Sequence, residues 1–415
     1  LTAPQPLKTT ELTDHLSADV AIVGGGFTGM SAALHLAVRG IKAVVLEGKQ
    51  IGYGGAGRNV GLINGGMWVM PKELPGVLGQ VYGDRLIDIL GNAPLLVREL
   101  VERYEIPCEI EKNGTLHCAV GESGLAALKE RHAQWSERGA PVTLLSAEET
   151  AKLVGTKAYC GALHDSRAGT IQPLAYVRGL AKAAISTGAA IYTESPVLST
   201  TREGESWRVH TPKGSVSAKW IIVASEAYST GPWEVIRQEQ VYLPYFNVAT
   251  KPLPSEVLKT ILPQRQGVWD TKEILSSFRL DQAGRLIFGS VGALRNTGTS
   301  IHRAWAIRSI KRIFPQIRDI EFEAEWYGQI GMTDNAVPRF HKFAENVVSF
   351  CGYNGRGIAP GSALGKCIAA HVAGDISEAD LPLPLTQAKP QNLRAIKEAY
   401  YEAGAQIAHF AGERF

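Results

Sequence analysis

The sequence predicts an α/β fold (α+β overall) in which a parallel sheet is assembled from distant segments and a second domain is built on a large antiparallel sheet. Three observations predict it. A strand, a glycine-rich turn, a helix and a second strand follow one another over residues 18–47. A similar strand, turn and helix recur at residues 346–374, near the other end of the chain. Between them, residues 240–295 have the alternation and turn residues typical of antiparallel strands.

The glycine cluster after the first strand predicts a nucleotide-binding turn. Residues 19–23 form an apolar run rich in Val and Ile, as expected of a strand buried on both faces. Gly24, Gly26 and Gly29 follow it as G-x-G-x-x-G. The first glycine permits a tight turn, the second lets the backbone approach a pyrophosphate, and the third lets the next helix pack against the strand.

The residues after this turn complete the βαβ pattern. Residues 31–39 are rich in Ala and Leu and predict a helix, whose first N–H groups favour a phosphate. Residues 42–46 predict the second strand, and Glu47 follows it, where an acid can bind a ribose hydroxyl. A second G-x-G-x-x-G begins at Gly52 but leads into no Ala-rich helix, so it predicts a glycine loop over residues 52–66.

The remaining elements are expected in the following order. The stretch CEIEKNGTLHCAV predicts a hairpin that turns at Asn113-Gly114, and Ser146 with Glu149 forms a capping box. The other expected elements are helices at 84–104, 123–138, 173–186 and 303–313, a strand at 189–195, and hairpins at 206–224 and 274–289.

The composition is that of an ordinary globular chain. The 415 residues allow two or three domains, and the net charge of +3 is too small to indicate a nucleic acid as partner. No apolar run reaches the roughly 20 residues of a membrane span, and no signal peptide is visible. The five cysteines form no C-x-x-C pair and are expected to be reduced, which predicts a cytoplasmic protein without a metal site.

The second strand, turn and helix unit narrows the choice of nucleotide. An NAD domain is usually one contiguous array, whereas this unit lies near the opposite end of the chain. A flavin nucleotide is long, so distant segments are needed to reach its adenine and its isoalloxazine ring. A helix that begins near Gly361 could direct its dipole at the flavin edge where negative charge develops on reduction. A buried unit without any ligand is the alternative.

Four stretches resemble, in order, the sequence blocks of the D-amino-acid oxidase superfamily of FAD enzymes, and most closely its γ-glutamylputrescine oxidase-like branch. They are DVAIVGGGFTG, VVLEGKQIGYGGAGRNVG, KWIIVASEAYS and NVVSFCGYNGRGIAPGSALGK. The resemblance implies a discontinuous Rossmann-like FAD-binding domain at residues 1–83, 147–235 and 326–415, with a C-terminal helix at 390–411. It implies a substrate-binding domain at residues 84–146 and 236–325.

The resemblance also implies which residues bind FAD. The matching positions are Gly24, Gly26, Phe27, Thr28, Gly29, Glu47, Gly48, Lys49, Gly55, Ala56, Gly57, Arg58, Asn59, Leu62, Val197, Ala224, Ser225, Gly328, Gly355, Arg356, Gly357, Ile358 and Ala359. FAD is expected to be bound non-covalently, because the stretch QIGMTDNAVP lacks the cysteine that tethers flavin in sarcosine oxidases.

Departures from the family pattern carry the substrate prediction. Ala359 stands where sarcosine oxidases have a lysine, and Ile330 stands where glycine oxidases have an arginine. Because burying an unpaired carboxylate is costly, the substrate is expected to be an amine whose reacting carbon is not next to a carboxylate. Either of two arginines could replace the missing anchor, and a structural role for each stays open. Residues that could contact the substrate are Arg356, Arg279, Tyr245 and Trp68.

The sequence therefore predicts an FAD-dependent oxidoreductase that acts on CH–NH donors. The leading interpretation is oxidation of a primary or secondary amine by hydride transfer to flavin N5, after which the imine is hydrolysed. The alternatives are an oxidase or dehydrogenase of an amino or cyclic imino acid (glycine, proline or pipecolate), a flavoprotein subunit of a larger complex, and a quinone-reducing dehydrogenase at a membrane surface. Oxygen or another acceptor would reoxidise the flavin, and the choice between them stays open.

The C-terminal segment predicts an amphipathic helix with a docking role. Its apolar residues recur at alternating spacings of three and four: Leu393, Ile396, Tyr400, Ala403, Ile407 and Phe410. The opposite face carries charges of both signs, whereas membrane-surface helices concentrate Lys and Arg there. The stripe is expected to pack against this protein or a second subunit, which leaves a homo-oligomer open, and membrane association is not expected.

Overall fold

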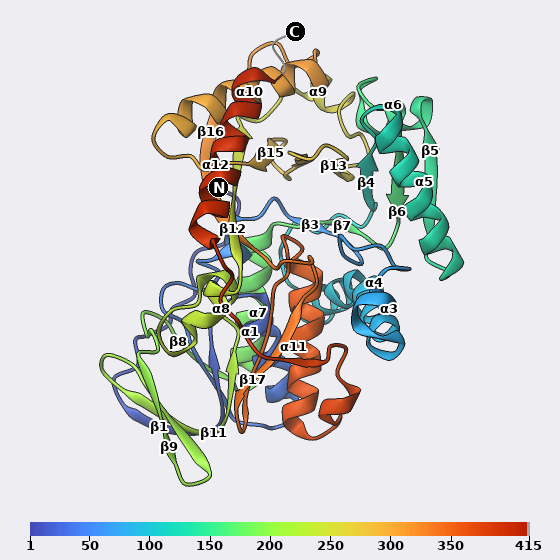
Figure 1. The fold of residues 1–415 in the computed structure, drawn as a ribbon. Helices are drawn as coiled ribbons and strands as arrows, with labels where there is room; N and C mark the ends of the chain where they lie inside the picture. Colours follow the sequence, from blue (N-terminus) through green and yellow to red (C-terminus); the bar gives the residue numbers. More distant parts are fainter. Residues whose placement is uncertain (413–415) are drawn as a thin grey trace.

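The strands lie in two large sheets, the first in the lower half of Figure 1 and the second in the upper half. The structure, a computed structural model, describes residues 1–412. Within these residues the first sheet has nine strands, the second has eight, and β3 (Leu62–Ile63) pairs with β7 (Gly169–Thr170). The mixed α/β class predicted from the sequence is confirmed.

The first sheet is mostly parallel and joins segments that are far apart in the sequence. Its main path is β19 (Leu385–Thr386), β17 (Arg339–Ala344), β18 (Val347–Cys351), β11 (Ser215–Val223), β1 (His15–Val23), β2 (Ala43–Leu46) and β8 (Ala190–Tyr192), and β10 (Ser206–His210) with β9 (Ser199–Glu203) extends from β11. Every residue of β2 and β18 is buried, as expected of strands covered on both faces. The strand β18, near the C-terminal end of the chain, pairs in parallel with β11, which pairs in parallel with β1.

Helices cover one face of this sheet. They are α1 (Phe27–Val38), α7 (Pro173–Thr187), α11 (Ile358–Ala373) and, outside α11, α4 (Gln80–Arg103). The two helices that follow the glycine-rich turns, α1 and α11, pack directly against each other. A Cβ on Gly365 would lie 2.6 Å from the carbonyl oxygen of Thr28, so glycine permits this close approach. The beginnings of α1 and α11 therefore lie at the same edge of the sheet.

The second sheet is mostly antiparallel and lies above the carboxyl ends of the first-sheet strands. Its order is β16 (Phe322–Met332), β12 (Val241–Thr250), β15 (Leu286–Val291), β14 (Ser276–Leu280), β13 (Gly267–Asp270), β4 (Thr115–Cys118), β6 (Gly161–Asp165) and β5 (Val142–Ser146). The hairpin predicted around Asn113-Gly114 does not form. Pro107 lacks an N–H group and Glu109 has a positive φ of 52°, so the first half of that stretch forms no strand, and β4 pairs instead with β6 and β13.

Several helices differ from their predicted limits, and the others complete the fold. α1 begins at Phe27 rather than residue 31, α10 (Thr297–Ile313) begins six residues early, and a one-turn helix lies within the predicted glycine loop. The capping box of Ser146 and Glu149 is confirmed at the start of α6. The helices not yet given are α2 (Gly55–Arg58), α3 (Leu74–Leu78), α5 (Gly121–Glu137), α6 (Ala147–Val154), α8 (Glu234–Gln238), α9 (Ser255–Leu258) and α12 (Arg394–Ala411).

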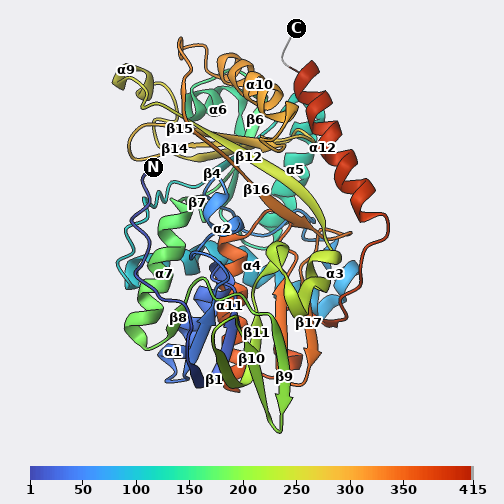
Figure 2. The same cartoon turned by 90° about the vertical axis from the view of Figure 1, so that its left-hand side faces the viewer.

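The last helix, α12, lies against α10 and β12 along the outer edge of the molecule (Figure 2). The sequence-based division grouped this segment with the first sheet, whereas its contacts are with elements of the second. None of the helices in residues 1–412 combines the length and the apolar composition that a bilayer span requires.

Candidate active site

A cavity of about 850 Å³ lies between the two sheets, beyond the carboxyl ends of β1, β2 and β11. In an open sheet of parallel strands, ligands bind in the crevice outside the carboxyl ends of the strands. The two sheets contribute to its lining in different ways. The first sheet supplies the glycine-rich turns and the beginnings of α1 and α11, and the second supplies aromatic and apolar side chains. The cavity is therefore built from both ends of the chain.

The first glycine-rich turn has the geometry that its spacing predicts. Gly24 has a φ of 110°, and a Cβ on it would lie 2.8 Å from the carbonyl oxygen of Ala224. A Cβ on Gly29 would lie 2.0 Å from the carbonyl oxygen of Gly24, so this glycine packs α1 onto the turn and lies outside the cavity lining. Gly26 precedes α1, faces the cavity and provides no side-chain cap. The uncapped N–H groups of the first turn of α1 are thus available to an anion.

The acid after β2 lies beside this turn. The carboxylate of Glu47 accepts hydrogen bonds from the backbone N–H groups of Gly25 (2.6 Å) and Lys49 (2.8 Å). Burial raises the pKa of Glu47, and these backbone donors partly oppose that shift. The cavity lining includes Gly25, Glu47 and Lys49 together with Val197. This end of the cavity has the acid and the backbone donors that suit a ribose.

The second glycine loop is held in place by Asn59 and by the second sheet. The Asn59 side chain donates to the carbonyl oxygens of Gly55 and Ala56 (3.0 Å each) and closes the end of α2. The carbonyl oxygen of Arg58 accepts hydrogen bonds from the side chains of Asn247 (3.0 Å) and Trp326 (2.9 Å). Like Gly29, the predicted Gly57 lies outside the cavity lining: a Cβ there would lie 2.3 Å from the carbonyl oxygen of Gly52.

The turn between β18 and α11 forms the opposite wall. Asn354 has a positive φ of 52°, and its side-chain oxygen accepts the N–H of Thr333 (2.8 Å). α11 begins at Ile358, three residues before the predicted Gly361, and Gly357 provides no side-chain cap. Thr28 and Tyr353 are hydrogen-bonded through their hydroxyls (2.6 Å), which ties this turn to the start of α1. Two uncapped helix N-termini therefore face one cavity.

Aromatic side chains line the part of the cavity nearest the second sheet. The Trp68 indole donates to the carbonyl oxygen of Asn354 (2.6 Å) and meets Trp269 edge-on at 5.3 Å between ring centroids. The hydroxyl of Tyr245 is hydrogen-bonded to that of Ser277 (2.6 Å). Trp68 and Tyr245, two of the residues predicted to contact the substrate, both line the cavity. Sequence reasoning missed Trp269, because the pattern around β13 predicts an antiparallel strand but no binding residue.

Arg356 is a buried cation in this aromatic region. Its guanidinium lies 4.7 Å from the Trp68 ring centroid and 4.9 Å from that of Trp269, and Nη1 donates to the Gly65 carbonyl oxygen (3.0 Å). Nε is buried without a hydrogen-bond partner among residues 1–412. Burial lowers the pKa of Arg356 to about 9, so it stays protonated at neutral pH. This side chain could therefore still bind an anionic group.

Arg279, the other predicted anchor, lies outside the cavity lining. Its Nε donates to the carbonyl oxygen of Val60 (2.6 Å), and Nη1 donates to that of Leu280. The structure thus gives Arg279 a role in holding the second glycine loop. Ile330 and Ala359 stand where the sequence resemblance implies an arginine or a lysine in related oxidases. Both residues line the cavity, and their side chains are apolar.

The other residues predicted to bind the cofactor line the cavity. They are Gly24, Gly26, Phe27, Thr28, Glu47, Gly48, Lys49, Gly55, Ala56, Arg58, Asn59, Leu62, Val197, Ala224, Ser225, Gly328, Gly355, Arg356, Gly357, Ile358 and Ala359. Sequence reasoning missed several further lining residues, most of them aromatic or polar: Tyr53, Asn64, Glu226, Tyr228, Leu243, Trp269, Lys272, Glu273, Ser277 and Tyr353. Most of them come from strands and loops that reach the cavity only through the tertiary fold.

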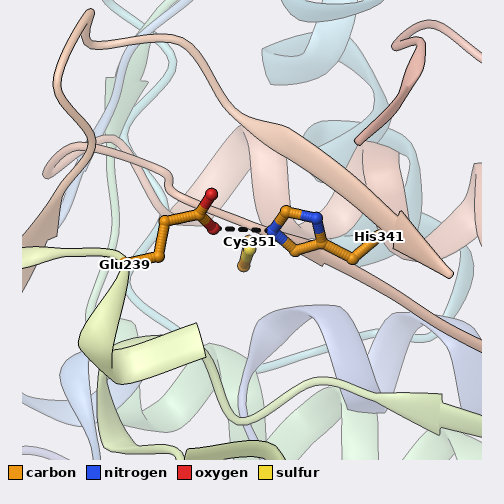
Figure 3. A group of neighbouring side chains, drawn as sticks. All are labelled: Glu239, His341 and Cys351. Carbon is orange, nitrogen blue, oxygen red and sulfur yellow. Dashed lines mark hydrogen bonds and ion pairs between the residues drawn. The ribbon is translucent and has the colours of Figure 1, made fainter. Parts of the chain in front are cut away.

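A separate group of three potential metal ligands joins α8 to the first sheet (Figure 3). The His341 ring is hydrogen-bonded through Nε2 to the Glu239 carboxylate (2.7 Å) and through Nδ1 to the Thr386 carbonyl oxygen (3.0 Å). Burial raises the pKa of the Cys351 thiol well above its ordinary value, so the thiol is protonated. Both ring nitrogens have hydrogen-bond partners, so the group is accounted for as a hydrogen-bonded contact within the fold.

Comparison with known proteins gives relatives that span nearly the whole chain. The family described as FAD dependent oxidoreductase matches residues 19–371. Gamma-glutamylputrescine oxidoreductase of Escherichia coli (strain K12) is 30% identical over 376 residues, which cover 89% of this chain and 87% of that protein. The probable oxidoreductase OrdL of Haemophilus influenzae is 29% identical over 414 residues, which cover 98% of this chain and 94% of that protein.

Solved structures share the fold. Glycine oxidase from Geobacillus kaustophilus superimposes with a TM-score of 0.73 at 22% identity, covering 90% of this chain and 99% of that one. L-amino acid deaminase from Proteus myxofaciens superimposes with a TM-score of 0.74 at 17% identity, covering 90% and 94%. At these identities the likeness concerns the arrangement of the two sheets and leaves the substrate undetermined.

Proposed function

The chain belongs to the family of FAD dependent oxidoreductases, and from this premise we propose that it oxidises a C–N bond of a primary or secondary amine whose reacting carbon carries no carboxylate. The observation that carries the proposal is the apolar character of Ile330 and Ala359 in the cavity lining. A carboxylate on the reacting carbon would face these positions unpaired, which is costly in a buried site. The Escherichia coli relative, named for an amine substrate, supports the same reading.

FAD fits the donors of the cavity. The uncapped start of α1 at Gly26 and Phe27 would hold the pyrophosphate, and Glu47 would hold the adenosine ribose. The uncapped start of α11 at Gly357 would face the isoalloxazine ring. A Cβ on Gly26 would come within 4 Å of Ala56 alone, so glycine leaves room for a ligand at that turn. When bound, FAD supplies the acceptor for the hydride that the amine loses.

The side chains of the second sheet would bind and orient the amine. The rings of Trp68, Trp269 and Tyr245 line the cavity and would form a largely apolar wall that excludes water from the reacting carbon. Hydride transfer needs a neutral amine, because a protonated nitrogen has no lone pair to assist it. The rate of flavin reduction is therefore expected to rise with pH until the bound amine is deprotonated.

An α-amino acid or a cyclic imino acid is the second candidate substrate. The observation that favours it is Arg356, a buried guanidinium beside the aromatic wall whose Nε has no partner among residues 1–412. Charge-assisted hydrogen bonds from arginine are well suited to a carboxylate. Asp165, the acid that acts on Arg356 through charge, is itself bound to Arg167 at 2.7 Å. A carboxylate of the substrate could therefore pair with Arg356 in place of Asp165.

A flavin-bleaching screen without oxygen tests the proposal. Purified protein is mixed with primary diamines, their γ-glutamyl conjugates, glycine, sarcosine, proline and pipecolate, and loss of the oxidised flavin absorbance is followed. Bleaching by the diamines or their conjugates supports the proposal. Bleaching by the α-amino or imino acids alone would support the second candidate. Bleaching by none of them would indicate a partner-dependent flavoprotein subunit.

A further inference from the structure

The helix α12 is attached to the body through its polar face. Glu398 accepts the backbone N–H of Tyr242 (3.1 Å), and Glu402 forms a two-point ion pair with Arg295. His409 is buried, stacks on Trp305 at 3.8 Å between ring centroids, and is hydrogen-bonded to His302 (2.8 Å). Because the polar face of α12 contacts the rest of the protein, the opposite face of the helix points outward.

The apolar stripe of α12 consequently faces away from the protein. We define the stripe as Leu393, which directly precedes α12, together with Ile396, Tyr400, Ala403, Ile407 and Phe410 on the helix itself. The exposed fractions of the large side chains are 68% for Leu393, 64% for Ile396, 73% for Tyr400, 70% for Ile407 and 56% for Phe410. Packing against the same chain, one of the two coverings expected from the sequence, is thus wrong for Leu393, Ile396, Tyr400 and Ile407. The helix lies along the outer edge of the molecule, where a partner can reach it (Figure 2).

We propose that the stripe pairs with the stripe of a second copy of this chain, in an antiparallel arrangement across a two-fold axis. The spacings along the stripe are three, four, three, four and three, which read the same in both directions. A two-fold axis at the midpoint therefore places every member opposite another member. Leu393 would face Phe410, Ile396 would face Ile407, and the large Tyr400 would face the small Ala403. This self-complementarity is what an isologous interface requires.

The residues beside the stripe favour a second copy over a lipid surface. On one side of the stripe the flanking residues are Asn392, Ala399 and Gln406. On the other side they are Lys397, Gly404 and Ala411. They include one charge, and the same symmetry places Lys397 opposite Gln406 rather than opposite another cation. Small flanking residues let two helices approach closely. A membrane-surface helix would instead carry several Lys or Arg residues beside its apolar face.

The exposed area is on the scale of a dimer interface. Large aromatic side chains bury about 150–250 Å² each, so the stripe supplies roughly 500 Å² per copy toward the about 800 Å² per partner of a stable interface. Tyr401, which is 45% exposed, lies beside the midpoint of the stripe and adds to this surface. The inference concerns assembly and does not depend on the reaction proposed above.

The mass of the protein in solution tests the pairing. Light scattering after gel filtration at micromolar concentration is expected to give twice the chain mass for the wild type and the chain mass for the double variant Ile396→Glu/Ile407→Glu. The control Val81→Glu changes an equally exposed apolar residue on α4 (59%) and is expected to remain a dimer. Unchanged flavin absorbance and thermal unfolding would show that each variant is folded. A monomeric wild type, or a dimeric double variant, would overturn the proposal.

Cross-linking tests the antiparallel register. In a Cys160→Ser background, which removes the exposed native thiol, the double variant Tyr400→Cys/Ala403→Cys is expected to give a disulfide-linked dimer on mild oxidation. Leu393→Cys is expected to give none, because the two copies of residue 393 would lie about 25 Å apart along the helices. Cross-linking through residue 393 would contradict the register. Co-sedimentation of a monomeric wild type with anionic vesicles, lost in Ile396→Glu/Ile407→Glu, would assign the stripe to a membrane instead.

Discussion

At the scale of single residues, Arg356 is the position where binding of a substrate carboxylate can be tested. Replacing it with Met keeps a long apolar side chain against Trp68 and removes the charge. For a substrate that carries a carboxylate, we expect KM to rise about 10- to 100-fold, since hydrogen bonds to charged groups contribute about 1.5–3 kcal/mol. For an amine without a carboxylate, KM is expected to change little. Steady-state kinetics with the two substrates measure the difference.

Arg279→Met is the matched control for that measurement. Arg279 bonds the carbonyl oxygen of Val60 and lies outside the cavity lining. Its loss is expected to lower stability without separating the two classes of substrate. If Arg356→Met raised KM equally for both substrates, a role for Arg356 in binding a carboxylate would be ruled out.

Glu226 gives the protein a predictable dependence on pH. Burial raises the pKa of this carboxyl from 4.5 to about 6, although the N–H of Gly352 donates to it (3.0 Å). An acid with a raised pKa favours folding in its protonated form. That contribution is complete below pH 4.5 and is lost as the pH rises through about 6. Relative to Glu226→Gln, the wild type should lose about 2 kcal/mol of unfolding free energy across this window.

Chemical unfolding of both proteins over a series of pH values measures this effect. The amide of Glu226→Gln has the same shape but does not titrate, so it is the reference at every pH. Parallel pH profiles for the two proteins would show that Glu226 has no shifted pKa.

The sequence could predict those site residues whose function is local. Gly24, Gly26 and Gly29 are recognisable because a turn, a helix start and a strand contact need glycine at fixed spacing, and Glu47 because it ends the next strand. Trp269 could not be found in this way. It reaches the cavity only because β13 lies beside β14 in the second sheet, and nothing in its neighbours along the chain encodes that position.

At the scale of elements, the attachment of α12 is expected to weaken in acid. Burial lowers the pKa of His302 to about 4 and that of His409 to about 3, so both rings are neutral in the folded protein. A base with a lowered pKa stabilises the fold above its ordinary value of 6.5. That stabilisation is lost progressively as the pH falls from 6.5 towards 4. The protection of residues 394–411 against hydrogen exchange, measured relative to the intrinsic exchange rate at each pH, should therefore decrease across this range before the rest of the protein unfolds.

His409→Phe is the matched variant for this prediction. Phenylalanine can stack on Trp305 as the imidazole does, but it cannot take up a proton. The protection of α12 relative to the intrinsic exchange rate should then depend less on pH. An unchanged pH dependence in this variant would show that the histidine pair does not control the attachment of the helix.

Helices and strands were predictable where the local sequence pattern also determines which neighbouring element they pack against. The βαβ unit at the N-terminus and the unit at residues 346–374 both formed, because continuous apolar strands and glycine turns have few alternatives. The hairpin around Asn113-Gly114 failed, because a turn signal does not reveal that Pro107 and Glu109 interrupt the first strand. The three- and four-residue spacing of apolar residues in α12 predicted the stripe. It did not predict that the charged face, rather than the stripe, contacts the rest of the protein.

At the scale of the whole molecule, the cavity predicts that FAD is bound without a covalent link. Among residues 1–412, the cavity lining includes no cysteine. Cys351 is fully buried on β18 beside His341 and lies outside the cavity lining. Acid precipitation is expected to leave the yellow colour in the supernatant. Colour that stays with the protein pellet would mean that another residue tethers the flavin.

The central claim is that the enzyme oxidises an amine whose reacting carbon carries no carboxylate. The most direct measurement compares two compounds: the most reactive amine from the bleaching screen, and the same amine with a carboxylate on its reacting carbon. The rate of flavin reduction without oxygen is measured for both. Ile330 and Ala359 predict that the added carboxylate slows reduction at least about tenfold, because an unpaired buried carboxylate costs more than 1.4 kcal/mol. Faster reduction by the carboxylated compound would contradict the account.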